Sequence, residues 1–319
     1  MEDNLNKIQY ICNFFTNNFS ITFFVIVNSD IIYKGNIHCH STNSDGQLSP
    51  EKVCEFYKNL NYDFISLTDH FKSEYNFTIS DTSNFSDDKF TTITGAELHA
   101  GKNSNGDEWH ILSVGIPKDF TSPTEDESGP EIATRALKAG AFVAIAHPEW
   151  SGLNLNDALS MPLGIHAIEA FNGVCKTFGR ENGSYLIDQV MASGRMIGAI
   201  ATDDAHYYEK DANAGWVMVQ AASNSHDDIL DALKSGNYYG STGPEIIRSE
   251  IVSEYFHVET SNVDYIGLVG RGARFEKISG ENLKEAKLPL AKFHNSWARL
   301  ILRTNDGKQA WGHPFKVYL

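Results

Sequence analysis

Short apolar runs alternate with segments of helical periodicity over the first two thirds of the chain. The run 63–68 is preceded by the segment 49–60, in which apolar residues recur at helical spacing. This segment opens with Ser49-Pro50-Glu51, and a capping serine followed by proline and an acidic first turn is a typical helix start. Together with the run that ends near residue 40, the order strand, helix, strand predicts a βαβ unit.

The same alternation continues as far as residue 244. Apolar runs at 91–98, 109–116, 141–146, 165–171 and 196–201 predict further strands, and 130–140 and 184–194 predict helices. About seven strands, most of them ending on His, Asp or Glu, predict an α/β barrel with its site at the carboxyl edge.

One connection in this series is too short for a helical crossover. The residues between Ala100 and Trp109 include Asn105-Gly106, which is a hairpin signal. We therefore expect the barrel to be irregular here, with Glu97 and His110 on neighbouring antiparallel segments.

The pattern changes in the last third of the chain. A final amphipathic helix is expected at 225–236, and the short alternating runs 255–259, 265–269, 274–278, 297–303 and 315–318 predict a small all-β appendage. We expect an N-terminal extension (1–32), a barrel (33–247) and a small β domain (248–319). Polar residues interrupt the apolar stretch 11–27 and no cleavage site follows, which favours a short helix and a strand over a signal or membrane segment.

The charge and the cysteine content of the chain limit the functions that the protein is expected to have. The 319 residues carry a net charge of −15, which disfavours binding of long duplex nucleic acid. A small phosphate ester stays possible, because bound cations dominate the field close to them. The four cysteines are scattered without a C-x-x-C pair, so we expect neither a disulfide framework nor a zinc ribbon, and a reduced, cytoplasmic setting.

Two pairs of residues at alternate positions carry the candidate chemistry. His38 and His40 leave the same face of an extended strand, and two neighbouring imidazoles form a clamp for Zn, Fe, Mn or Ni. Asp204 and His206 repeat this spacing at the end of another strand. Asp45 follows the first pair in a turn-rich segment, which allows its carboxylate to fold back toward the imidazoles.

Nine residues at or near strand ends form the full set of candidate metal ligands: His38, His40, Asp45, His70, Glu97, His110, His147, Asp204 and His206. Any one histidine is more often structural, but strands usually exclude Asp and Glu, so a set of this size is hard to obtain by chance. Such a set can fill the coordination sphere of more than one metal with a bridging carboxylate, and we assign the bridge to Glu97.

For other polar residues the evidence for a place in the metal site is weaker. His99 lies on the face of Glu97 but equally suits a hairpin cap, and Glu169 either sits in the site or pairs with a lysine. Asp69 and Asp203 adjoin candidate ligands and are expected to orient imidazoles. Two cations follow the sixth strand and could meet an anionic substrate, although solvated surface charge is the more frequent role for such residues: Lys176 and Arg180. Five histidines are expected at the surface or in loops: His166, His226, His257, His294 and His313.

Taken in order, the motifs resemble those of the PHP (polymerase and histidinol phosphatase) superfamily over about 35–244. They are His38-x-His40, Ser44-Asp45-Gly46, Thr68-Asp69-His70, Gly95-x-Glu97, His110 in a strand, Ala146-His147-Pro148 and Asp204-x-His206. The β appendage, preceded by Tyr-Gly-Ser-Thr-Gly-Pro, looks like the CehA/McbA branch.

The resemblance implies a distorted (β/α)7 PHP barrel that holds two or three divalent ions of Mn, Fe or Zn. It assigns the ligands to three groups: His38, His40, Glu97 and Asp204; Glu97, His110 and His147; and Asp45, His70 and His206.

These observations lead us to expect a metal-dependent phosphoesterase that hydrolyses a small anionic phosphate ester by a metal-activated hydroxide. The expected catalytic residues are Asp45, Glu97 and His206, with His206 as the proton donor to the leaving alcohol. Two alternatives stay open: amide or carbamate hydrolysis at the same metals, and a non-catalytic, metal-stabilised binding barrel. No membrane partner is expected.

Overall fold

The computed structural model describes residues 31–318, so the expected features of residues 1–30 lie outside the described chain. The first ten strands are β1 (Ile32–Asn36), β2 (Phe64–Leu67), β3 (His70–Phe71), β4 (Thr91–Leu98), β5 (Ile111–Val114), β6 (Phe142–Ile145), β7 (Ala167–Asn172), β8 (Gly198–Thr202), β9 (Trp216–Gln220) and β10 (Tyr238–Ser241). The other strands are β11 (Ile246–Val252), β12 (Tyr255–Gly270), β13 (Phe275–Pro289), β14 (Ser296–Arg303), β15 (Gln309–Trp311) and β16 (Phe315–Val317).

The α-helices lie mainly between the earlier strands. They are α1 (Pro50–Asn59), α2 (Gly129–Lys138), α3 (Leu155–Ser160), α4 (Ser184–Ala192), α5 (Tyr208–Asp211) and α6 (His226–Lys234). Short 3₁₀ helices are η1 (Ser73–Tyr75), η2 (Ser83–Phe85), η3 (Val174–Phe178) and η4 (Ala291–Phe293). None of the helices within 31–318 has the length and hydropathy that a membrane crossing requires.

The expected start of α1 is confirmed. Ser49 has extended backbone and its side chain accepts a hydrogen bond from the Lys52 amide, while Pro50 begins the helix. A side-chain cap of this kind contributes about 1 kcal/mol to helix stability. The expected helices at 130–140, 184–194 and 225–236 correspond to α2, α4 and α6.

The strands form one 16-stranded sheet with parallel and antiparallel parts. β1, β2 and β4 pair in parallel, as do β6, β7 and β8. Between these two groups, β5 is antiparallel to both β4 and β6. Glu97 lies opposite Leu112 in the β4–β5 pair, which confirms the expected antiparallel arrangement of the Glu97 and His110 segments.

The expected (β/α)7 barrel is not confirmed. The hydrogen-bonded order ends at β8 and does not close onto β1, although an isolated parallel bridge joins Cys39 to Ala205. The antiparallel pairs β4–β5, β5–β6, β1–β9 and β9–β10 break the strict alternation of parallel strands and helices. The result is a mixed α/β fold with a large, open sheet.

Helix α6 packs against the amino ends of several strands. Its Ile229 and Leu233 belong to one buried cluster with Phe64, Ile93 and Phe142, which lie in β2, β4 and β6. Apolar burial of this kind contributes roughly 1.5–3 kcal/mol per large side chain. Because α6 covers the amino ends of these strands, a site can form at their carboxyl ends, which α6 does not cover.

From Ile246 onward the described chain forms antiparallel strands and the single turn η4. The expected runs 255–259 and 265–269 belong to one strand, β12, so their prediction as separate strands was wrong. The β12–β13 register shifts between Glu259 and Tyr265, which is the signature of bulges. Bulges allow a strand to continue through polar residues that resemble a turn in the sequence.

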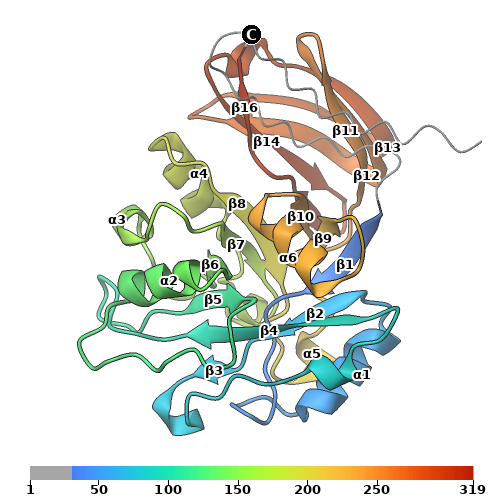
Figure 1. Ribbon diagram of the computed structural model, residues 1–319. Helices are drawn as coiled ribbons and strands as arrows, with labels where there is room; N and C mark the ends of the chain where they lie inside the picture. Colours follow the sequence, from blue (N-terminus) through green and yellow to red (C-terminus); the bar gives the residue numbers. More distant parts are fainter. Residues whose placement is uncertain (1–30, 319) are drawn as a thin grey trace, which may run out of the picture.

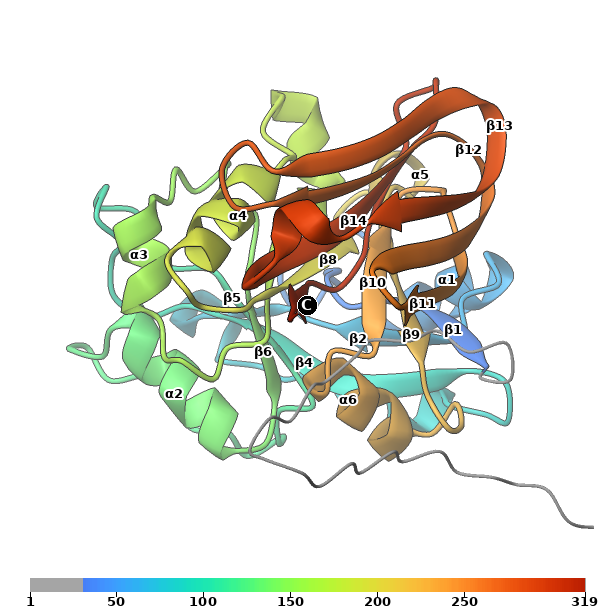
Figure 2. The same cartoon turned by 90° about the horizontal axis from the view of Figure 1, so that it is seen from above.

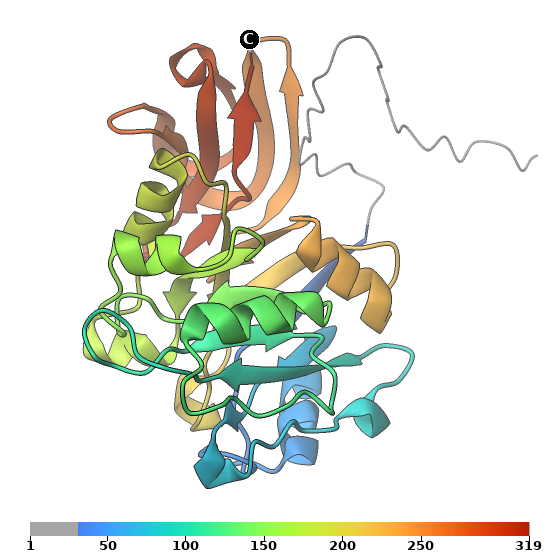
Figure 3. The ribbon, with the colours of Figure 1, turned by 60° about the vertical axis from the view of Figure 1, so that its left-hand side comes forward.

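The C-terminal strands contact the earlier part of the chain through α4 and β10. The fully buried Arg299 pairs with Asp188, with Nη2 2.6 Å from Oδ1, and Trp311 Nε1 donates to Ser184 Oγ at 2.9 Å. In Figure 1 the strands β11–β14 and β16 lie above β2–β5, with β9 and β10 between. Figure 2 shows β12–β14 lying over β8 and β10. Figure 3 again shows the C-terminal strands above the earlier part of the chain.

Candidate metal centre

All nine expected ligands converge at the carboxyl side of the sheet. Their places are His38 and His40 after β1, Asp45 in the next loop, His70 in β3, Glu97 in β4, His110 before β5, His147 after β6, and Asp204 and His206 after β8. Most of them line a cavity of about 190 Å³, and His38 and His40 are fully buried beside it. Residues that are far apart in the sequence therefore meet at one edge of the sheet, because they lie at or near strand ends.

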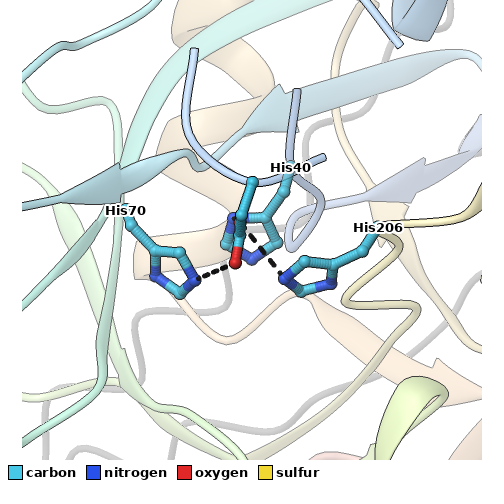
Figure 4. Close-up of side chains that lie close together, drawn as sticks. His40, His70 and His206 are labelled. Carbon is cyan, nitrogen blue, oxygen red and sulfur yellow. Dashed lines mark ion pairs between the residues drawn. The ribbon is translucent and has the colours of Figure 1, made fainter. Parts of the chain in front are cut away.

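One part of the cluster surrounds the Asp45 carboxylate. His70 Nε2 and His206 Nε2 each lie 3.4 Å from one of its oxygens, and His40 Nδ1 lies 3.9 Å away. Figure 4 shows the rings of His40, His70 and His206 turned toward one another. The potential ligand atoms of these four residues lie within 4.8 Å of each other, a spacing that suits a single ion.

The second part of the cluster surrounds Glu97, whose two oxygens face different histidines. Oε1 lies 2.7 Å from His110 Nδ1 and 3.1 Å from His147 Nε2. Oε2 lies 2.7 Å from His70 Nδ1 and 3.7 Å from His38 Nε2. A buried carboxylate with each oxygen facing a separate group of imidazoles has the geometry of a bridging ligand.

Asp204 completes the cluster on the side of β8. Its Oδ1 lies 3.1 Å from His38 Nε2 and 3.0 Å from His40 Nε2. Asp204 has φ 55° and His147 has φ 22°, in the left-handed region that side chains other than glycine rarely adopt. Strained backbone of this kind is concentrated at functional sites.

Electrostatics keep the carboxylates of the cluster ionised. Burial raises the pKa of Glu97, but His70 and His110 outweigh burial and hold it well below the usual range. Burial also acts on Asp204, whose pKa the histidines His38 and His40 nevertheless lower. The cluster is therefore a concentrated source of negative charge in a buried setting.

The histidines divide into two groups. Burial, together with neighbouring imidazoles, lowers the pKa of His40 to about 4. For His70 burial is outweighed by Glu97 and Asp45, which raise the pKa to about 10, and for His206 it is outweighed by Asp45 and Asp204, which raise it to about 9.

The donor set fits divalent transition-metal ions. Imidazole nitrogens and carboxylate oxygens are the ligands that Zn, Fe and Mn share. His38 Nε2 and Glu97 Oε2 are buried and lie 3.7 Å apart, and neither makes a well-directed hydrogen bond among the described residues, although His70 Nδ1 and Asp204 Oδ1 lie close to them. A cation between them would satisfy both.

The sequence left the role of Glu169 open, and the structure places it beside His38. Its Oε1 lies 2.7 Å from His38 Nδ1 and accepts a hydrogen bond from Thr202, while its Oε2 accepts from the His147 amide. Asn172 donates to both Glu169 and Asp204. Glu169 thus orients His38 from behind, the role that carboxylates play for metal-bound histidines.

Asp69 and Asp203 hold loops, contrary to the expectation that they orient imidazoles. Asp69 accepts from Ser41, Ser44 and Ser80, which fixes the loop that carries Asp45. Asp203 accepts from Tyr57 and from the three successive backbone amides of residues 213–215. Among the described residues, the two carboxylates accept hydrogen bonds from these loops and, for Asp203, also from Tyr57 in α1.

His99 belongs to the cluster, whereas the five other histidines do not line the cavity. His99 Nε2 lies 2.9 Å from His70 Nδ1, and His99 groups with His70, Glu97 and His110 as possible ligands. Three of the others lie in connecting segments, as expected: His166, His294 and His313. The remaining two lie in regular elements, His226 in α6 and His257 in β12.

Comparison with known proteins finds similarity in solved structures alone. No protein-family model matches the sequence, and no curated protein matches it. A two-domain protein from Bacteroides vulgatus, described as containing a predicted PHP-like metal-dependent phosphoesterase, is similar with a TM-score of 0.51 at 16% identity, over 95% of this chain and 99% of that chain.

Two further structures are similar over part of this chain. One is a protein from Bifidobacterium adolescentis described as a candidate metal-dependent phosphoesterase, with a TM-score of 0.42 at 14% identity over 63% of this chain and 96% of that chain. The other is an amidohydrolase from Chromobacterium violaceum with bound sulfate, with a TM-score of 0.41 at 14% identity over 56% of this chain and 89% of that chain. The fold is thus shared with the Bacteroides protein over nearly the whole length of both chains.

Proposed function

We propose that this protein is a PHP-type, metal-dependent phosphoesterase that hydrolyses a small phosphate ester. The observation that carries the proposal is the position of Glu97. Its two buried oxygens face separate groups of histidines at the centre of a nine-residue cluster. A structural carboxylate would be satisfied by one such group, whereas a bridging ligand needs both.

The same residues would hold two or three divalent ions. One group consists of His38, His40, Glu97 and Asp204; a second of Glu97, His110 and His147; a third of Asp45, His70 and His206. Bound cations would lower the pKa of a water molecule and neutralise charge on the phosphate oxygens. Neighbouring histidines lower the pKa of Glu97 and Asp204, which favours the ionised form of both carboxylates.

His206 is the proposed proton donor to the leaving alcohol. Its Nδ1 lies 2.7 Å from the backbone oxygen of Asp204, which leaves Nε2 turned toward the cavity beside Asp45. Asp45 and Asp204 raise the pKa of His206 to about 9 against the effect of burial. Donating a proton and binding a cation are alternative roles for Nε2, since one nitrogen cannot do both at once.

Turnover by the metal-loaded protein tests the proposal. We expect release of phosphate from p-nitrophenyl phosphate after loading with Mn, Fe or Zn, and loss of this activity in His38→Ala and Asp204→Ala. His226→Ala is the matched control, because His226 is exposed at the start of α6. Hydrolysis of a carbamate or amide without any phosphate ester would contradict the proposal, and so would metal binding without turnover of any of them.

A further inference from the structure

One wall of the cavity is apolar. Trp150, Val174, Cys175 and Phe178 line it together with the histidines and carboxylates. Trp150 stands edge-on to His147, with ring centroids 5.0 Å apart and an interplanar angle of 84°. This wall has no polar group suited to holding phosphate, so it is available to another part of the substrate.

The two aromatic side chains of this wall are exposed. Trp150 is 41% exposed and Phe178 62% exposed, while Trp109, Trp297 and Trp311 are all nearly buried. Aromatic side chains bury large areas when they find a partner, and exposed ones beside a cavity mark ligand sites. A ligand in the cavity would therefore cover the aromatic surface of Trp150 and Phe178 that is now exposed.

Hydrogen bonds hold the segments that carry these aromatic residues. The Asn182 amide donates to Glu149 Oε2 at 3.0 Å, which ties the turn before Trp150 to the segment that follows Phe178. The Cys175 amide donates to Asn172 Oδ1, which anchors η3 to the end of β7. The wall is thus built on anchored backbone and keeps its shape without a ligand.

No lysine or arginine of the described chain lines this cavity. Lys176 lies in η3 but lines a separate cavity together with Lys308. Arg180 Nη1 lies 3.5 Å from the Trp150 backbone oxygen, but the Arg180 side chain does not line the cavity. A second anionic group of the substrate inside the cavity would therefore lack a cationic lining residue, and desolvating such a group unpaired is unfavourable. The cavity volume of about 190 Å³ suits a small organic group beside the phosphate.

Building on the proposed function, we propose that the group esterified to the phosphate is small, uncharged and apolar, and that Trp150 and Phe178 contact it. The phosphate faces the histidine and carboxylate side of the cavity, and the organic group lies against the aromatic wall. Phosphate esters of charged sugars, nucleotides and carboxylic acids are then poor substrates.

Binding of two phosphonates tests this assignment without turnover. We would measure dissociation constants of the metal-loaded protein for phenylphosphonate and methylphosphonate by calorimetry. Burial of a phenyl ring on apolar surface predicts roughly ten-fold tighter binding of phenylphosphonate. Trp150→Ala and Phe178→Ala are each expected to reduce this preference several-fold, with little change for methylphosphonate. The control Leu163→Ala removes a side chain that is 87% exposed and outside the cavity lining, so the preference should persist.

Turnover of phenyl phosphate and 3-phosphoglycerate separates the two proposals. A higher kcat/KM for phenyl phosphate, lowered in both aromatic variants, would support the assignment. Equal or higher kcat/KM for 3-phosphoglycerate, or equal affinity for the two phosphonates, would overturn the apolar assignment and leave the phosphoesterase proposal standing. Failure to bind either phosphonate and to turn over either ester would overturn both.

Discussion

The carboxylate of Glu169 lies 2.7 Å from Nδ1 of His38, and both side chains are fully buried behind the candidate metal centre. This contact leaves His38 Nε2 directed at Glu97 and Asp204, at 3.7 Å and 3.1 Å. The orientation of a candidate ligand is therefore determined by a residue that does not itself line the cavity.

Replacing Glu169 with glutamine tests this relationship. Glu169→Gln keeps the shape of the side chain but removes the charge that orients His38, so we expect metal affinity to fall by about 10–100-fold. Competition with a chelator of known affinity measures the change. Glu125→Gln, at an exposed position, is the control. Unchanged metal affinity in Glu169→Gln would show that the contact between Glu169 and His38 does not contribute to metal binding.

Metal binding is expected to stabilise the folded chain. Cations bound to the native cluster and not to the unfolded chain would stabilise it by about 4 kcal/mol at a thousand-fold excess over Kd, which corresponds to a rise in Tm on the order of 10 °C. Scanning calorimetry with and without a chelator measures the shift, and Asp204→Asn should reduce it. An identical Tm in both conditions would contradict a cation-binding cluster.

The loop that carries Asp45 depends on Asp69. This buried carboxylate accepts hydrogen bonds from Ser41, Ser44 and Ser80, and bonds to charged groups are worth about 1.5–3 kcal/mol each. We expect Asp69→Asn to lower the free energy of unfolding by about 2–3 kcal/mol in urea denaturation. Asp88→Asn, at an exposed position nearby, should change it by less than about 0.5 kcal/mol. Equal effects of the two substitutions would refute this role of Asp69.

His313 provides a pH-dependent contribution away from the cavity. Its ring packs against Tyr238, and burial lowers its pKa to about 4 from 6.5. Because the unfolded chain binds the proton more readily, the contribution is present above pH 6.5 and is lost as pH falls toward 4, by about 3 kcal/mol at most. In His313→Gln, the loss of unfolding free energy between pH 7 and pH 4.5 should be smaller than in the wild type. The same slope in both proteins would contradict this prediction.

Local signals in the sequence predict some parts of this molecule well. Ser49 and Pro50 specify the start of α1 through contacts within a few residues, and Asn105-Gly106 correctly indicates the antiparallel return between Glu97 and His110. Convergence of the nine candidates also follows from the sequence, because each lies at or near the end of a strand.

Long-range pairing accounts for what the sequence did not predict. Whether β8 closes onto β1 depends on strands that are far apart in the chain, and β12 continues through bulges where polar residues suggested a turn. Glu169 lies in the apolar run of β7 without a local signal, and its role follows from its contact with His38. The aromatic wall is likewise unrecognisable before Trp150 and Phe178 are seen beside one cavity.

The metal content of the purified protein tests the central claim most directly. Elemental analysis should find two or three equivalents of Mn, Fe or Zn per chain, and clearly fewer in Asp204→Ala at equal folded content by circular dichroism. The absence of bound metal, with none taken up on reconstitution, would contradict the metal-centre assignment and the proposed hydrolysis with it.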